Sequence, residues 1–128
     1  MSGISIGKAI YSLLSQSQEL EGLLGEKKIF PLIVNSDTRL PFIVYKRLSS
    51  NPYFSKDYYS ETEVQFAIVT EKYSEGIDIA ELVNQVILQS KGNTYNGMTI
   101  DKVEQTSVEE TFYEDAFTQV LTYKFITH

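Results

Sequence analysis

The chain has 128 residues and a formal net charge of −6; 42% of its residues are hydrophobic and 22% are charged. This size and composition are typical of a globular protein with one core, so we expect residues 1–128 to form a single domain. The acidic balance argues against a general nucleic-acid binder, which needs cationic surface to displace counterions from phosphate. The chain has no cysteine, which excludes disulfides and zinc–thiolate sites. No run approaches the ~18 apolar residues of a membrane helix.

The N-terminal segment predicts a helix. Apolar residues recur at helical spacing from Ile6 to Leu14, and Ser2 or Ser5 is suited to cap the helix. Residues 19–25 predict one more helical turn, which Gly25 ends.

Two apolar runs, residues 28–34 and 40–47, each contain a proline and flank a polar turn at residues 35–39. Because proline cannot donate a hydrogen bond to a sheet ladder, it occurs at the start of a strand or on an edge. The segment therefore predicts a hairpin or a split strand pair with at least one exposed edge. Such an edge has to be covered, charged or used for pairing.

Asn-Pro and several serines predict a loop at residues 49–61, which is long for a connection between two strands. The loop carries Tyr53, Phe54, Tyr58 and Tyr59, whereas disordered segments are poor in aromatic residues. We therefore expect the loop to dock, either on its own domain or on a neighbouring molecule. These four residues form a candidate interface between subunits or with a partner.

The second half of the chain predicts a strand, a helix and two more strands. Residues 63–70 alternate as a half-buried strand does, and an apolar stripe from Ile79 to Ile87 predicts a helix capped by Ser74. Residues 98–108 and 112–126 predict the last two strands, with a hairpin at 108–111 and a bulge at 114–116. The resulting order, α-β-β-β-α-β-β, predicts an α+β fold of one mostly antiparallel sheet with two helices packed on one face.

Acidic residues concentrate between positions 99 and 118, which hold six acids and one base. The candidate acidic face consists of Glu104, Glu109, Glu110, Glu114 and Asp115. The simplest interpretation is a solvated hairpin, and the alternative is an acidic surface with a function. Nothing in an exposed hairpin raises the pKa of a carboxyl for acid–base catalysis. The cluster also lacks the spacing of a calcium-binding loop.

Catalytic and cofactor motifs are not evident. His128 is the single histidine and the last residue, so we expect it to be poorly held, and a Ser–His–Asp arrangement would depend on it. We see neither a glycine-rich phosphate loop nor a dinucleotide-binding motif. We therefore expect no enzymatic activity, no cofactor and no metal.

Several short motifs follow one another in a specific order. They are Lys28-Ile-Phe-Pro31, Leu40-Pro-Phe-Ile-Val-Tyr-Lys-Arg47, Val64-Gln-Phe66, Tyr73-Ser-Glu75, Tyr113-Glu-Asp115 and Leu121-Thr-Tyr-Lys-Phe125. Together they resemble the tail-completion, or tail-terminator, proteins of long-tailed bacteriophages and prophages. The resemblance covers essentially the whole chain, and the segments around Pro31 and Pro41 are its strongest points.

The resemblance implies a structural virion protein that joins the tail to the head. It implies a homo-oligomeric ring, typically of six copies, at the head-proximal end of the tail tube, with the tail tube protein and the head connector or neck protein as partners. Double-stranded DNA would pass through the ring without specific binding, and no membrane would be involved. The ring would be assembled in the host bacterial cytoplasm. The acidic residues could then line the hole, where they would repel DNA phosphates.

Two other functions stay open. One is a head-completion or neck protein of related fold. The other is a non-viral adaptor module that pairs a peptide strand with an exposed sheet edge.

Overall fold

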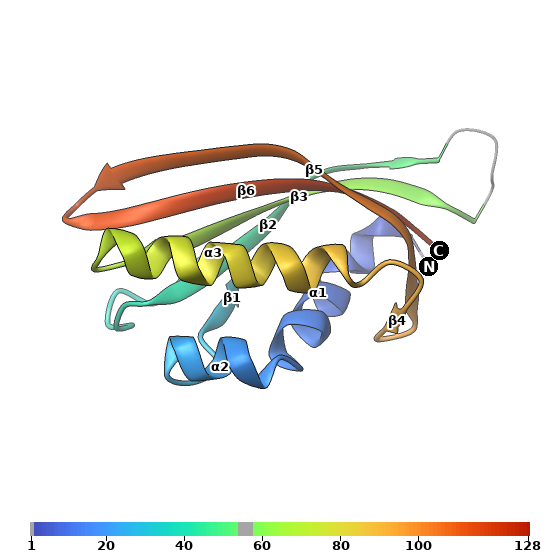
Figure 1. Ribbon diagram of the computed structural model, residues 1–128. Coiled ribbons are helices and arrows are strands. Elements are labelled where there is room, and N and C mark those ends of the chain that lie inside the picture. The colour runs from blue at the N-terminus through green and yellow to red at the C-terminus, as the bar shows by residue number, and fades with distance from the viewer. Residues whose placement is uncertain (1, 54–57) are drawn as a thin grey trace.

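The computed structural model describes residues 2–53 and 58–128, and within them it is an α+β fold of one six-stranded sheet and three α-helices (Figure 1). The helices are α1 (Ile6–Ser15), α2 (Gln18–Leu24) and α3 (Tyr73–Leu88), and a 3-10 turn at Gly3–Ser5 precedes them. The strands are β1 (Ile29–Pro31), β2 (Phe42–Pro52), β3 (Ser60–Thr70), β4 (Thr94–Tyr95), β5 (Met98–Tyr113) and β6 (Ala116–Thr127). The predicted fold class is confirmed. The helical turn predicted at residues 19–25 is the separate helix α2, and β4 is added to the predicted order.

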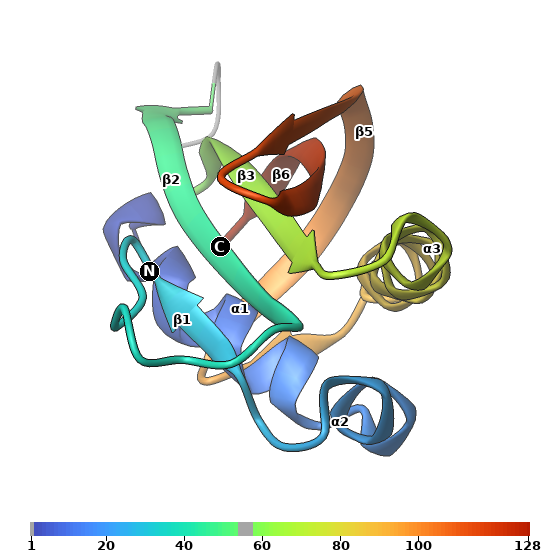
Figure 2. The ribbon, with the colours of Figure 1, turned by 90° about the vertical axis from the view of Figure 1, so that its left-hand side faces the viewer.

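The strands follow the order β1-β2-β3-β6-β5-β4 across the sheet. All neighbouring strands are antiparallel except β1 and β2, which are parallel. The three helices lie on one side of the sheet, which curves around α1, and no described helix covers the opposite side (Figure 2). One face of the sheet is therefore core and the other is open.

The core lies between the helices and the central strands. Residues of β3 alternate strictly between buried and half-buried along its length. Phe66 is fully buried and packs edge-on against Tyr123 of β6, with ring centroids 5.6 Å apart. The open face carries the half-buried residues of the same strands, such as Val69.

The N-terminal helices form largely as predicted. The predicted stripe of α1 is buried. Ser5 occupies the N-cap of α1 without a side-chain cap bond, whereas the Ser2 hydroxyl caps the preceding 3-10 turn by accepting from the Ile4 amide at 3.3 Å. A second helix follows because the Ser17 side chain caps it through the Leu20 amide. Gly25, with φ of 86°, ends this helix as predicted, since glycine adopts that backbone region without steric cost.

Of the two alternatives predicted for residues 28–47, the hairpin is wrong and the split strand pair with an exposed edge is confirmed. β1 runs parallel to β2 and lies at the edge of the sheet. After Pro31 the chain leaves the sheet, and the Leu32 amide donates to the Tyr45 carbonyl at 2.8 Å. A tight hairpin requires antiparallel strands, whereas residues 32–41 here form a longer return path.

The predicted loop at residues 49–61 is too long. After a bulge between Arg47 and Ser49, β2 continues to pair with β3 as far as Pro52 and Ser60. The pairing includes a hydrogen bond of 2.9 Å between the hydroxyls of Ser50 and Thr62. The sequence did not predict these strand ends, because their side chains are polar and show no apolar alternation. Residues 53–59 connect the two strands.

The hairpin predicted for the last two strands is confirmed, but its turn does not lie at residues 108–111, and the bulge predicted at 114–116 is wrong. β5 continues to Tyr113, and the turn consists of Glu114 and Asp115, whose φ angles are 51° and 62°. Two positive φ angles in a two-residue connection are typical of the turn that matches strand twist. The register shifts lie instead between Ile100 and Lys102 and between Gln105 and Ser107.

The predicted cap of α3 is wrong as well. The helix begins at Tyr73 with Lys72 at its N-cap, so Ser74 lies inside the first turn. The Thr70 hydroxyl donates to the Lys72 carbonyl at 2.8 Å and fixes the chain where it leaves β3. None of the helices in the described residues is long and apolar enough to cross a membrane.

The one-sided core gives a direct test. We expect Phe66→Ala to lower the free energy of unfolding by about 3–5 kcal/mol, because it leaves a cavity in the packed face. Val69→Ala, on the open face of the same strand, is the matched control and should cost roughly 1 kcal/mol or less. Urea unfolding followed by circular dichroism measures both. Equal losses would contradict the assignment of core and open faces.

Candidate interaction surfaces

The five predicted acidic residues all lie on β5 or at its turn, and all are exposed. Glu104, Glu109 and Glu110 lie along β5, and Glu114 and Asp115 form the turn. The structure therefore brings them together on one hairpin, as the sequence predicted. Whether they face a hole in a ring stays a prediction.

Glu110 is the one member of this group that other side chains hold in place. Its carboxylate accepts a hydrogen bond from the Tyr73 hydroxyl at 2.8 Å and from the Gln119 amide at 3.0 Å. The bond from Gln119, followed by that from Tyr73, lowers the pKa of the Glu110 carboxyl. In turn, hydrogen bonding to Glu110 and its negative charge raise the pKa of the Tyr73 phenol. The contact ties the hairpin to the first turn of α3.

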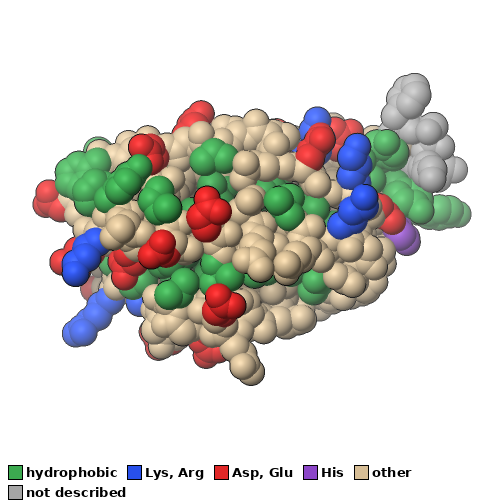
Figure 3. Space-filling view, viewed as in Figure 1, with side chains coloured by type: hydrophobic (Ala, Val, Ile, Leu, Met, Phe, Trp, Pro, Cys, Tyr) green, Lys and Arg blue, Asp and Glu red, His purple; other side chains and the backbone are tan. Residues whose placement is uncertain are grey.

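An aromatic cluster near the turn was missed by sequence reasoning. The Phe117 ring lies 4.8 Å from Phe112 and 5.7 Å from Tyr73, measured between centroids. Phe112 is 57% exposed and Tyr113 is 71% exposed. Hydrophobic side chains gather beside acidic ones at the left end of the face in Figure 3, where Figure 1 draws the β5–β6 turn. The sequence did not predict this cluster, because the turn was placed at residues 108–111. The aromatic and acidic residues next to one another at 112–115 could have indicated it.

The opposite edge of the sheet is basic and also carries exposed apolar residues. The Lys28 ammonium is largely buried and donates to the Arg39 carbonyl at 3.0 Å. Leu32 and Ile33, which follow β1, are 69% and 81% exposed. Sequence reasoning found the edge here but not its charge.

The predicted tyrosine loop is described only in part. Tyr53 is half-buried, and its amide donates to the Tyr59 carbonyl at 2.8 Å. Tyr58 is 80% exposed, whereas Tyr59 is half-buried. Phe54 lies outside the described residues. Two of the three described tyrosines are thus half-buried and one lies in solvent, and an interface role stays a prediction.

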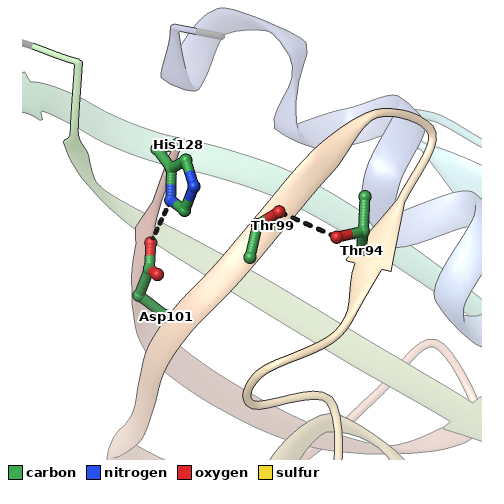
Figure 4. Close-up of polar contacts among 4 residues, drawn as sticks. All are labelled: Thr94, Thr99, Asp101 and His128. Carbon is green, nitrogen blue, oxygen red and sulfur yellow. Dashed lines mark hydrogen bonds and ion pairs between the residues drawn. The ribbon is translucent and has the colours of Figure 1, made fainter.

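His128 is well held, contrary to the prediction. Its amide and carbonyl exchange hydrogen bonds with Thr99 at 3.0 and 2.9 Å. Its Nδ1 atom lies 2.7 Å from the Asp101 carboxylate, as Figure 4 shows beside the hydroxyl contact between Thr94 and Thr99. The ring also packs against Tyr59, with centroids 4.7 Å apart. The backbone bonds to Thr99 hold its main chain, and the contacts with Asp101 and Tyr59 hold its ring.

The described residues hold no group of three His, Asp or Glu side chains that could bind a metal ion. Within the described residues, the Asp101 carboxylate and the His128 ring contact each other, and neither side chain forms a hydrogen bond with a serine hydroxyl. The exposed surfaces described above are the candidate functional sites.

The Tyr73–Glu110 contact can be tested by titration. We expect Glu110→Ala to lower the pKa of Tyr73 toward its ordinary value, because both the hydrogen bond and the nearby negative charge are lost. Glu109→Ala is the control and should leave this pKa unchanged. The measurement is a pH titration of isotope-labelled tyrosine by NMR. An unchanged Tyr73 titration in Glu110→Ala would show that the contact is absent in solution.

The chain matches no protein-family model and none of the curated proteins. Solved structures do match it. A chain of the virion of a native gene transfer agent particle is similar over 98% of both chains, with a TM-score of 0.76 and 11% sequence identity. The bacteriophage SPP1 gp17 protein is similar over 95% of this chain and 88% of its own, with a TM-score of 0.64 and 16% identity.

At these identities the likeness shows a common fold. The resemblance to bacteriophage proteins that the sequence predicted is confirmed at this level. The chain has the fold that a gene transfer agent virion component and the SPP1 gp17 protein share.

Proposed function

We propose that this chain is a structural component of a tailed-phage virion and acts by assembly rather than by catalysis. The observation that carries the proposal is the similarity to a gene transfer agent virion chain over 98% of both chains, at a TM-score of 0.76. The exposed sheet edges and aromatic residues of the described chain also support it, since such surfaces are suited to protein contacts.

Within this class, we propose a ring at the head-proximal end of the tail tube. The chain would act as one domain, with six copies joined head to tail, the tail tube on one side and the head connector on the other. A ring requires a heterologous interface that closes, in which two different surfaces of the same chain meet. DNA would pass through the hole. The sequence resemblance to tail-completion proteins supports this finer assignment.

The ring offers two environments for the acidic hairpin. In the hole, its carboxylates would repel DNA phosphates and would not retain the genome in transit. In the contact between copies, they would face a basic surface. The exposed aromatic residues on the same hairpin favour the contact, because a water-filled hole gives Phe112 and Tyr113 nothing to pack against.

The assignment is tested with purified protein and with headless tails from the same phage. We expect rings by negative-stain imaging, either of the protein alone or bound at one end of the tails. Connector preparations that lack tails are the control, because binding to these alone would indicate a head-completion role. A protein that stays monomeric at high concentration and binds neither tails nor connectors would contradict the proposal and favour an adaptor.

Tyr58 gives a second test, which concerns the tyrosine loop. We expect Tyr58→Ala to weaken binding to headless tails by roughly tenfold, since exposed tyrosines are frequent anchors of interfaces. The free energy of unfolding should change by less than about 0.5 kcal/mol, because this side chain is 80% exposed. Tyr11→Ala, on helix α1, is a control with a partly exposed tyrosine. Unchanged tail binding by Tyr58→Ala would exclude the loop from the interface.

A further inference from the structure

We infer that copies of this chain bind one another through the two opposite edges of the sheet, the basic edge of one copy against the acidic edge of the next. The inference rests on the proposed assembly and identifies its contact surfaces. We define the basic edge as residues 27–47, which include β1 and the start of β2. The acidic edge is residues 103–115, which form the outer part of β5 and the turn.

Both surfaces lie at unpaired edges of the sheet, and the longer run of free backbone groups belongs to β5. β1 pairs only with β2 among the described strands. β4 pairs with β5 only at Met98 and Thr99, so residues 103–113 pair on one side alone, with β6. On the outer side of β5, alternate N–H and C=O groups are available to another chain. β1 offers fewer such groups, because Pro31 has no N–H and its carbonyl accepts from the Ile33 amide at 2.7 Å.

The two edges also lie at the same level of the sheet. Strand pairing connects Ile29 with Ile43, then with Ile68 and Gln119, and ends at Glu110. β1 is parallel to β2, and three successive antiparallel pairs separate β2 from β5, so β1 and β5 run in opposite directions. A second copy placed alongside in the same orientation therefore brings antiparallel edges together at matching heights.

The charges of the two edges are complementary. The basic edge contains five bases and one acid, Asp37, and the acidic edge contains five acids and no base. The bases are Lys27, Lys28, Arg39, Lys46 and Arg47. None of the charged side chains on either edge forms an ion pair within the described residues. Lys28 and Arg47 instead donate to backbone carbonyls, of Arg39 and Ile4 respectively. Opposite charges on two surfaces of one chain favour contact between copies and set its orientation.

Exposed apolar residues lie beside the charges on each edge. Leu32 and Ile33 belong to the basic edge, and Val108, Phe112 and Tyr113 to the acidic edge; all five are at least 54% exposed. Contact between the edges would bury them within a charged rim, which is the usual anatomy of a protein interface. Because the two surfaces differ, the contact is heterologous and permits a closed ring.

The test reverses charge on one edge at a time. The acidic-edge variant carries Glu109→Lys, Glu114→Lys and Asp115→Lys, and the basic-edge variant carries Lys27→Glu, Arg39→Glu and Lys46→Glu. We expect each variant alone to associate roughly tenfold more weakly or worse, because like charges then meet in every contact. In a 1:1 mixture every contact between unlike variants is again complementary, so alternating rings should form. Sedimentation velocity and negative-stain imaging measure both effects.

The control variant carries Glu19→Lys, Asp78→Lys and Glu81→Lys, which reverse three exposed acids on helices α2 and α3. It changes the net charge as much as the acidic-edge variant does and should associate like the unmodified protein. All nine substituted side chains are exposed, and circular dichroism checks that the variants fold.

The outcomes separate the two levels of the proposal. If the unmodified protein forms no ring, alone or on tails, the proposed function fails. The edge contact is overturned, while the proposed function stands, in two cases. In one, both edge variants form rings as well as the unmodified protein does. In the other, the 1:1 mixture of the variants does not restore ring formation. If the acidic-edge variant still forms rings but slows DNA ejection, the hairpin lines the hole instead.

Discussion

Packing of α1 and α3 against one face of the sheet, with α2 packed on these two helices, is the constraint on which the other features depend. The strict alternation of β3 directs Phe66 and Ile68 into this single core and leaves the other face of the strand half-buried. The helices are shorter than the β5–β6 hairpin, which extends beyond them (Figure 1). The hairpin end, the two edges and the open face are consequently the surfaces available to other molecules.

Two polar contacts also join elements that pack together in the apolar core. The Tyr45 hydroxyl donates to the Gly7 carbonyl at 3.0 Å and joins β2 to α1. The Tyr123 hydroxyl of β6 donates to the Asn84 side chain of α3 at 2.6 Å. Burial raises the pKa of this tyrosine to about 12. Tyrosine thus serves two purposes in this fold, with its ring in the core and its hydroxyl at the boundary.

Sequence periodicity predicted the elements whose apolar pattern is regular, namely α1, β3, α3 and β6. It failed where polar residues form strand ends, as at Ser50 and Thr62, and where a turn lacks glycine, as at Glu114 and Asp115. The parallel pairing of β1 was not predictable, because nothing local distinguishes it from a hairpin arm. Composition alone predicted the acidic group. The aromatic cluster could be predicted only with the correct turn, because the turn determines which residues face one another across the hairpin. Whether Tyr59 lies against its own chain depends on the tertiary position of His128.

Separation of positive and negative side chains to opposite ends of the strand order gives the molecule an electric dipole that runs across the sheet. Two such dipoles exert a torque on each other before any atoms touch, over about one Debye length, or roughly 8 Å at physiological salt. Encounters between copies would be aligned in advance, with unlike ends facing. Dissolved salt would reduce this alignment. It would therefore lower the association rate of copies more than it raises the dissociation rate of a formed contact.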